Sequence, residues 1–477
     1  MQQVDDLGAM YLAAENSRVT THTAALITLD PAKLAGGKLT LDKLRAVVLE
    51  RLELVPAFHQ RLAEVPFGLD RPYWVETDVD LDYHVREISL PAPGDDEQLR
   101  EQVARIFSRP LDRTRPLWEI YLIQGLADGR AAVLTKVHHA IADGRTGVRI
   151  LTALTDSKPR PRRRRPSPRP PAPPAPASAS MLLRGLSGAV LQPVRAVAGL
   201  PAALSGLDEL PVFGTMPGVR LVGATTALVR RGRPHKPVAT APRTSFNQQI
   251  SRNRRIGIAT VALDDVKQVK THFAVSVNDV VLAMAAGALR RWLIEHSELP
   301  KEPLTAVIPV GLRDTGPDST ANELSAVVVP IPTDVDDAAA RLGVAHRAML
   351  GALRDLGTTA PDALIDTVRM VPPAFVVRTV QLLTQLNTWA PLTPAMNVNI
   401  SNVRGPEQLL YLAGARVCSM VPLAGITDGL GVNLTVMSYN GRLAIGVVAD
   451  REQVPDVQDI ADWTAAELDS LLTFARG

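Results

Sequence analysis

The first third of the chain contains two kinds of hydrophobic pattern, one typical of buried strands and one typical of amphipathic helices. The runs 24–29 (AALITL) and 131–137 (AAVLTKV) have the length and apolar character of buried strands. Residues 41–54 and 96–107 instead repeat apolar positions at the three- and four-residue spacing of amphipathic helices. A further helix is expected to begin near Gly147. Strands that alternate with helices indicate an α/β domain, which we place at residues 1–156.

The second half of the chain repeats this pattern. Ser276 is expected to cap a long helix that continues to Glu295, because a serine side chain can accept a hydrogen bond from the first turn. The other elements are predicted from apolar runs, namely strands at 257–263, 304–309, 325–331, 397–400, 431–437 and 443–448, and a final helix at 457–474. We therefore expect a second α/β domain at residues 240–477.

Between these halves lies a low-complexity segment, residues 157–180, that is rich in proline, arginine and alanine. Such a composition cannot bury a core, and it predicts an extended or disordered linker. The linker carries seven cations and no acid, so subtracting it from the formal net charge of +3 leaves −4 for the remainder. The simple interpretation is a solvated linker, and the sharper one is an electrostatic tether to anionic lipid.

The following segment, residues 181–239, begins with an amphipathic pattern. Its apolar residues recur at three- and four-residue spacing and are interrupted by Pro193; they are Leu183, Leu186, Val190, Val194 and Val197. This crossover segment can pack on the protein, as most amphipathic helices do, or it can lie in a membrane interface. The spacing alone does not separate these alternatives.

Composition narrows the class of protein. An aromatic content of 4% argues against a nucleic-acid binder that works by stacking bases. The single cysteine, Cys418, lies in a strand-like apolar run, where we expect a small buried thiol rather than a nucleophile. The first residues have no secretory pattern, and no run of about 18 uncharged apolar residues predicts a membrane span. We expect a cytoplasmic location, with peripheral attachment to the inner face of the membrane or to lipid droplets as an alternative.

The candidate chemistry lies in the seven residues 138–144, HHAIADG, which follow a predicted strand. An imidazole with an ordinary pKa near 6.5 can accept a proton at neutral pH, so a histidine here can act as general base on a hydroxyl. Two other interpretations remain open. The histidine pair can be a buried, hydrogen-bonded structural element, or His139 and Asp143 can share a helical face and bind a metal, for which zinc would need a further ligand.

The segment resembles HHxxxDG, the active-site signature of acyltransferases built like chloramphenicol acetyltransferase and peptide-synthetase condensation domains. Other segments are similar to motifs of one group, the bacterial wax ester synthase/acyl-CoA:diacylglycerol acyltransferases. In the first half these are residues 5–15, 72–75, 82–85 and 110–119 (PLDRTRPLWE). In the second half they are residues 242–247, 277–283 (VNDVVLA), 309–313, 402–406, 411–416 and 431–434. Two positions depart from the family pattern, Gly311 in place of serine and Arg404 in place of proline.

This resemblance implies an α/β fold of two chloramphenicol acetyltransferase-like subdomains, which form a pseudo-symmetric sandwich with a central substrate tunnel. It implies transfer of a long-chain acyl group from acyl-CoA to diacylglycerol, which gives triacylglycerol, or to a fatty alcohol, which gives a wax ester. Acyl-CoA is then a co-substrate, and no cofactor or metal is expected.

The resemblance also implies roles for individual residues. His139 is the expected general base, and His138, which would point to the opposite face of the strand, is the neighbour. Asp143 is expected to organise the loop with a basic partner, for which Arg313 is the candidate, and Gly144 to permit a turn.

Three further residues complete the expected site. Asn278 is the candidate donor to the oxyanion of the tetrahedral intermediate, although Asn278 and Asp279 can also be read as a simple helix start. Trp118 either lines the acyl tunnel or fills the core, and the core is the usual place for a large aromatic ring.

Two other functions compete with this one. The same motif would serve an acyltransferase that takes its acyl group from a carrier protein or acylates a different alcohol. A non-catalytic lipid-surface protein could use the basic linker and the amphipathic segment alone.

Overall fold

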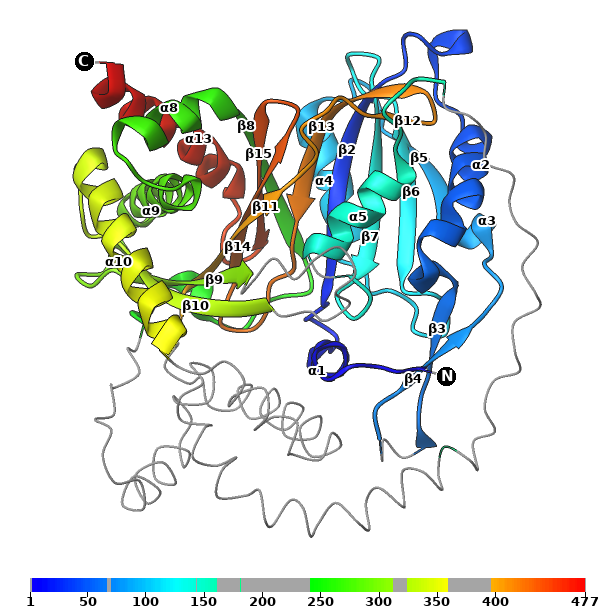
Figure 1. Cartoon of the computed structure of the whole chain (residues 1–477), viewed down its shortest axis with the longest axis horizontal. Helices are drawn as coiled ribbons and strands as arrows, with labels where there is room; N and C mark the ends of the chain where they lie inside the picture. Colours follow the sequence, from blue (N-terminus) through cyan, green and yellow to red (C-terminus); the bar gives the residue numbers. More distant parts are fainter. Residues whose placement is uncertain are drawn as a thin grey trace.

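The computed structural model describes residues 2–66, 70–142, 144–160, 181, 241–311, 324–358 and 396–476. Within these ranges, two six-stranded mixed sheets lie side by side (Figure 1). The linker and the amphipathic stripe predicted from the sequence fall almost entirely outside the described residues.

The first sheet has the order β12-β13-β2-β7-β6-β5. These strands are β12 (Tyr411–Leu412), β13 (Ala415–Leu423), β2 (His22–Asp30), β7 (Ala131–His138), β6 (Trp118–Gln124) and β5 (Val85–Ser89). Neighbours are antiparallel except for β5 and β6. A small sheet, β1 (Gln2–Gln3), β4 (Tyr73–Glu76) and β3 (Gln60–Ala63), lies beside it.

The second sheet has the order β10-β9-β11-β14-β15-β8. Its strands are β10 (Leu324–Ile331), β9 (Leu304–Gly311), β11 (Val398–Arg404), β14 (Val432–Tyr439), β15 (Arg442–Asp450) and β8 (Arg254–Ala262). Here β11 is parallel to both of its neighbours, and the other pairs are antiparallel.

Helices cover the sheets. The helices of the first half are α1 (Asp6–Ala14), α2 (Leu41–Arg51), α3 (Leu81–His84), α4 (Asp96–Phe107) and α5 (Gly144–Leu154). Those of the second half are α8 (Leu263–His272), α9 (Val277–Glu295), α10 (Ala338–Thr358) and α13 (Val457–Arg476), which lie on the outer face of the second sheet (Figure 1). Short 3-10 turns occupy Ala35–Gly37, Leu52–Leu54, Pro56–His59 and Ser245–Asn247.

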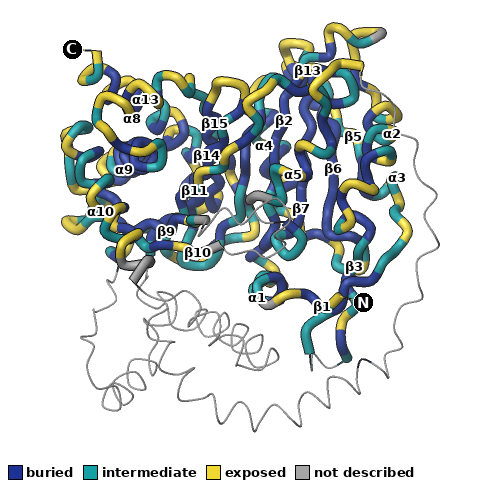
Figure 2. The backbone as a smooth tube through the Cα atoms, viewed as in Figure 1, coloured by how far each residue is buried: buried dark blue, intermediate teal, exposed yellow. Residues whose placement is uncertain are grey.

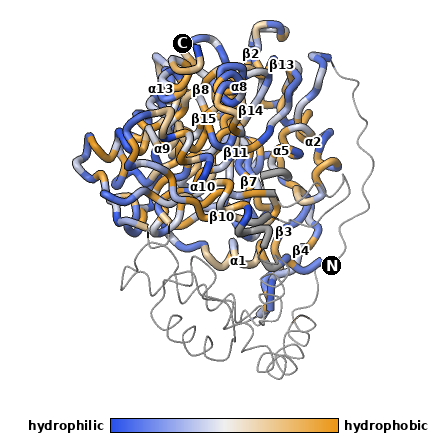
Figure 3. The backbone as a smooth tube through the Cα atoms, turned by 60° about the vertical axis from the view of Figure 1, so that its left-hand side comes forward, coloured by the Kyte–Doolittle hydropathy of each residue, from blue (hydrophilic) through white to orange (hydrophobic). Residues whose placement is uncertain are grey.

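Strand β2 shows how the sequence pattern builds two cores. Ala25, Ile27 and Leu29 pack with α2 and α5 on one face of the sheet. Ala24 and Leu26 point to the opposite face, where α4 and residues of β8 and β15 complete a second cluster. The alternation follows the period of two that a strand imposes on its side chains. The buried strands appear dark blue in Figure 2, and hydrophobic positions recur through both sheets in Figure 3.

The two large sheets are not each built from one half of the chain. Strand β13, which the sequence division places in the 240–477 half, pairs antiparallel with β2 and so extends the first sheet. The sheets also approach closely there, because a Cβ atom on Gly446 of β15 would lie 2.0 Å from the carbonyl oxygen of Pro422 in β13. The C-terminal part of the chain therefore completes the sheet that carries the HH motif.

Cys418 differs from its expected burial. It lies at an irregularity in the pairing of β13 with β2 and is only partly buried. Burial is still enough to raise the pKa of the thiol. A thiol with a raised pKa is a poor nucleophile at neutral pH, so the structure gives Cys418 no catalytic feature.

Within the described ranges, we find no single helix long and apolar enough to span a membrane. Helices α8 and α9, bent by 103° at their junction, meet that criterion only as a pair. Most of α9 is buried in the core of the second half.

Candidate active site

The two histidines of the HH motif lie where β7 ends, beside the start of β2. Helix α1 lies below the first sheet in Figure 1. Backbone hydrogen bonds fix this turn: the His138 N–H donates to Leu117 O, and the His139 N–H donates to Thr21 O. The Ile141 N–H then donates back to His138 O. Both histidines are thus held by the residues that directly precede β6 and β2.

His138 is fully buried, and both of its ring nitrogens are engaged. Its Nδ1 accepts the Ala140 N–H at 2.9 Å, so Nδ1 carries no hydrogen. Its Nε2 lies 3.0 Å from Thr21 Oγ1 and 3.3 Å from Glu15 Oε1. Because Thr21 Oγ1 donates its own hydrogen to Tyr11 O, it accepts from His138. The contacts define a neutral imidazole with its hydrogen on Nε2, and we interpret His138 as a structural residue.

Glu15 is the anion of this cluster, and its side chain is largely buried, at 10% exposure. Its carboxylate accepts from Arg113 Nη2 at 2.9 Å, from Arg113 Nε at 3.2 Å and from the Thr21 N–H at 2.9 Å. Burial alone would raise the pKa of Glu15, but the interaction with His138 and the hydrogen bonds from Thr21 and Arg113 lower it to about 2. Sequence reasoning assigned no role to these residues, although Glu15 and Arg113 lie in two of the motif-like segments.

His139 is placed differently from His138. It is only partly buried, and its ring stacks on Tyr11 of α1, with ring centroids 4.9 Å apart and an interplanar angle of 20°. A partly accessible imidazole on a fixed backbone can reach a substrate hydroxyl, whereas the ring of His138 is occupied on both sides. The geometry therefore favours His139 as the base of the pair.

The structure describes only some of the remaining residues of the HHxxxDG motif. Asp143 and its expected partner Arg313 lie outside the described residues, so their pairing stays a prediction. Gly144 is the first residue of α5. The other end of α5 is anchored by Arg51, which donates to Ala153 O and Thr155 O and forms a bidentate ion pair with Asp156 at 2.6 and 2.8 Å.

The second candidate group lies at the start of α9. Ser276 and Asp279 form a capping box, and Asp279 Oδ2 also lies 2.9 Å from His346 Nδ1. Asp279 is therefore a capping residue. Asn278 is partly buried, and its Oδ1 accepts from Asn402 Nδ2 at 2.6 Å. That bond joins two motif-like segments. The alignment of Asn278 with His139 on one substrate stays a prediction.

Trp118 is a core residue. It is fully buried, its Nε1 donates to Phe58 O at 3.0 Å, and its ring stacks on Phe58 with centroids 4.3 Å apart. His84 stacks at 4.3 Å as well. The structure thus supports core packing over tunnel lining for this ring.

Other motif residues also build structure. The motif-like segment 242–247 is held by buried Asn397, the residue before β11, which donates to Pro242 O at 2.6 Å and to Asn247 Oδ1 at 2.7 Å. A Cβ atom on Gly405 would lie 2.2 Å from Ser438 O, so this position requires glycine. Arg404, which departs from the family pattern, is an exposed residue paired with Glu407.

A second buried ionic cluster lies on the α4 side of β7. Lys136 is fully buried, donates to Ile106 O at 3.2 Å and to Arg109 O, and lies 3.9 Å from Glu119. Burial lowers the pKa of the Lys136 ammonium to about 8, even though the carboxylate of Glu119 opposes this effect.

The lowered pKa of Lys136 predicts that the stability of the protein depends on pH. The folded-state pKa of about 8 lies below the ordinary 10.5, so folding disfavours the charged form. The stability of the wild-type protein relative to Lys136→Met should rise by about 3 kcal/mol as the pH increases from 8 to 10.5. Urea unfolding of both proteins across this range measures the difference, and a constant difference would contradict the prediction.

Among the described residues, no three histidine, cysteine, aspartate or glutamate side chains are grouped as metal ligands. The described residues place the partly exposed His139 on a turn whose backbone is hydrogen-bonded, beside the buried His138 and the carboxylate of Glu15. Such a site can accept a proton from a substrate hydroxyl without forming a covalent intermediate.

Comparisons with known proteins agree with this class of site. Residues 4–281 match the wax ester synthase/diacylglycerol acyltransferase catalytic domain, and residues 320–472 match the C-terminal domain of that family. A Mycobacterium tuberculosis protein with the name diacylglycerol O-acyltransferase is 32% identical over 474 residues, which cover 99% of this chain and 90% of the relative.

Solved structures give the same result. A wax ester synthase/diacylglycerol acyltransferase from Marinobacter aquaeolei VT8 is 26% identical with a TM-score of 0.70, and the match covers 100% of both chains. The first condensation domain of the calcium-dependent antibiotic synthetase shares the fold alone, with 13% identity and a TM-score of 0.52 over 99% of this chain and 96% of that one. The fold is therefore the two-subdomain acyltransferase fold predicted from the sequence.

The fold and the site define an acyltransferase. The chain belongs to the wax ester synthase/diacylglycerol acyltransferase family.

Proposed function

We propose that this enzyme transfers a long-chain acyl group from acyl-CoA to the free hydroxyl of diacylglycerol, with His139 as general base. The observation that carries the proposal is the difference between the two histidines: His138 is buried and engaged at both ring nitrogens, whereas His139 is partly exposed at the same turn. The name of the mycobacterial relative supports diacylglycerol as acceptor.

The proposed reaction needs no enzyme-bound intermediate, because a thioester is already activated. His139 takes the proton of the acceptor hydroxyl as its oxygen attacks the thioester carbonyl carbon. The tetrahedral oxyanion then collapses, the carbon–sulfur bond breaks, and the proton passes from His139 to the CoA thiolate. The products are triacylglycerol and free CoA. Acyl-CoA serves as co-substrate in this scheme, and no further cofactor takes part.

Asn278 is the proposed donor to the oxyanion. With Oδ1 held by Asn402, its NH₂ group is the part left to hydrogen-bond a substrate oxygen. Removing one such donor typically lowers kcat by about 10²- to 10³-fold.

We therefore expect Asn278→Ala to lower kcat by about 10²-fold with a smaller change in KM, because the oxyanion exists only in the transition state. Asn402→Ala should have a weaker effect of the same kind, since it removes only the group that orients Asn278. Steady-state kinetics of both variants, with thermal melting as a folding control, checks this prediction. A change in KM alone for Asn278→Ala would contradict it.

The test of the function is thiol release from palmitoyl-CoA by the purified full-length protein, with lipid products separated by chromatography. Diacylglycerol and hexadecanol are compared as acceptors, because the family description also names wax ester synthase, and hexadecanol would give a wax ester. We expect acceptor-dependent CoA release with a triacylglycerol product, and a wax ester product would extend the acceptor to fatty alcohols. No release with either acceptor from folded protein would overturn the proposal and favour a carrier-bound donor or a lipid-surface role.

A further inference from the structure

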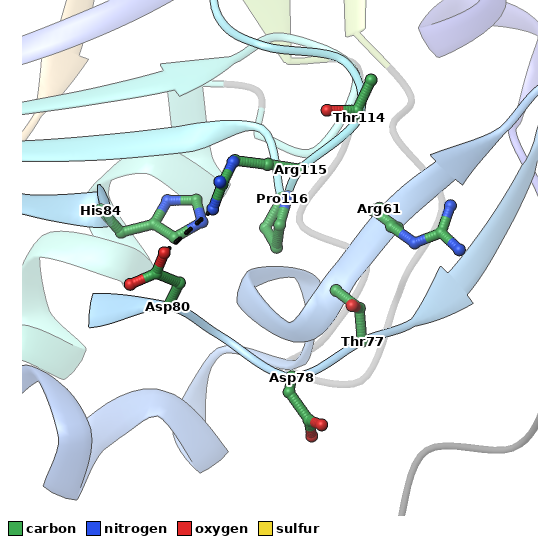
Figure 4. A pocket seen from close by; sticks show the side chains of 8 residues that line it. All are labelled: Arg61, Thr77, Asp78, Asp80, His84, Thr114, Arg115 and Pro116. Atoms are coloured by element: carbon green, nitrogen blue, oxygen red, sulfur yellow. Dashed lines mark hydrogen bonds and ion pairs between the residues drawn. The ribbon is translucent and has the colours of Figure 1, made fainter. Parts of the chain in front are cut away.

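His84 and His346 each join two elements of the fold, but of the two only His346 does so beside the proposed oxyanion donor. His84 lines the polar depression in Figure 4 and is buried. Its Nδ1 donates to Trp118 O at 2.7 Å, its ring stacks on Trp118, and its Nε2 is buried as well. Figure 4 shows the ring beside the ion pair of Arg115 and Asp80. We therefore assign His84 to the core of the first half.

His346 lies on α10 and hydrogen-bonds to the start of α9. Its Nδ1 is 2.9 Å from Oδ2 of Asp279. An ionised carboxylate can only accept, so the hydrogen of this bond is on Nδ1. Sequence reasoning assigned no role to His346 and did not predict α10. The bond joins α10 to the first turn of α9, across 67 residues of the chain.

Asp279 depends on this bond because its side chain is buried. Only 4% of that side chain is exposed, and Oδ2 also accepts the Ser276 N–H at 2.8 Å. Among the described residues, His346 is the one side chain that donates to this carboxylate. A buried carboxylate that loses a donor is destabilised, and a movement toward water relieves this cost. Loss of the His346 ring is thus expected to shift the first turn of α9.

The same turn carries Asn278, the residue directly before Asp279. The Oδ1 atom of Asn278 accepts from Asn402 Nδ2 of β11, so its side chain is held from β11 and its backbone through Asp279. We propose that His346 is a positioning residue for acyl transfer, which acts through Asp279 to fix the place of Asn278. The inference rests on the proposed function, because Asn278 is the donor proposed for the oxyanion.

The backbone of α10 is held independently of the His346 side chain. Leu342, Ala345 and Met349 are buried in one core with α9, whereas the side chain of His346 is 31% exposed. Substitution of His346 should therefore leave α10 packed on α9. This makes the role of the side chain accessible to mutation.

Steady-state kinetics of the full-length protein tests the proposal. His346→Leu removes the donor to Asp279 and is expected to lower kcat about tenfold with little change in KM, because a displaced oxyanion donor weakens the transition state more than substrate binding. His346→Asn should restore kcat to within about threefold of the wild type, since the Nδ2 of asparagine can donate from nearly the position of Nδ1. His346→Ala gives the decisive result if His346→Leu does not fold. Arg347→Leu, at the exposed neighbouring position of α10, is the matched control and should leave kcat unchanged.

A double-mutant cycle with Asn278→Ala separates positioning from a general loss of stability. In the Asn278→Ala background, His346→Leu should not lower kcat further, because the group that it positions is gone. An unchanged kcat in folded His346→Leu, or the same fold-loss in both backgrounds, would overturn the proposal and leave the acyl-transfer function in place. An unchanged kcat in Asn278→Ala would instead remove the oxyanion donor, and the role of His346 with it.

Nuclear magnetic resonance gives a second readout that needs no turnover. The side-chain NH₂ signals of Asn278, in protein with isotopically labelled asparagine, are identified by their loss in Asn278→Ala. They should shift in His346→Leu, stay in place in Arg347→Leu, and return toward the wild-type positions in His346→Asn. Unchanged signals in His346→Leu would overturn the proposal even if acyl transfer from CoA were not the reaction.

Discussion

Replacing His139 with alanine is expected to lower the acyl-transfer rate by at least about 10²-fold while the protein stays folded. The expectation follows from the position of the ring, which is partly accessible and stacked on Tyr11, on a backbone fixed by Thr21. Removal of this ring takes away the proposed proton acceptor and leaves in place the hydrogen bond from the His139 N–H to Thr21 O. The measurement is kcat for palmitoyl-CoA and diacylglycerol, with the melting temperature of each protein determined in parallel.

His272→Ala is the matched control for this experiment. His272 is an exposed histidine at the end of α8, and its loss should leave kcat unchanged. Near-wild-type activity of folded His139→Ala would remove His139 as the base. Activity that survives in His139→Ala but is lost in His138→Ala would transfer the role to His138, against the engagement of both its ring nitrogens.

Local signals in the sequence were sufficient for many elements. The predicted helix 96–107 coincides with α4, because Asp95 and Gln98 form a capping box at its start and its apolar stripe is continuous. Ser276 caps α9 as expected, and the strand before the HH motif is β7. These features depend on residues within a few positions of one another, which a periodic pattern records.

Pairing between distant segments could not be predicted in the same way. The apolar residues of β13 indicate a strand. Their pattern does not indicate that this strand pairs with β2, about 390 residues earlier in the chain. The same limit applies to the site. The motif locates His138 and His139, whereas Glu15, Thr21 and Arg113 reach them only because α1, β2 and the segment before β6 converge in the fold. A buried carboxylate is an expensive group, and its presence in an opening motif was the available signal.

The second large effect is expected when the carboxylate of Glu15 is replaced. Glu15→Gln is expected to reduce the free energy of unfolding at pH 7 by up to about 3 kcal/mol, because the folded-state pKa of about 2 lies well below the ordinary 4.5. A carboxyl with a lowered folded-state pKa stabilises the protein above its unfolded pKa, and this contribution is lost as the pH falls from 4.5 toward 2. The stability difference between wild type and Glu15→Gln should therefore shrink in that range. Glu101→Gln, at an exposed ion pair with Arg105 on α4, should change stability by less than about 1 kcal/mol.

Glu15→Gln should also affect catalysis, although Glu15 lies behind the base. Glutamine lacks the charge that helps to keep the hydrogen of His138 on Nε2, and a hydrogen on Nδ1 would break the bond from the Ala140 N–H and shift the turn that carries His139. We expect kcat to fall about tenfold or more at a temperature where the variant is folded, with little change in KM, because a misplaced base weakens the transition state more than substrate binding. Arg113→Met should produce the same pattern, since Arg113 holds the Glu15 carboxylate. If both variants lost stability but kept the wild-type kcat, the cluster would support the fold without positioning His139.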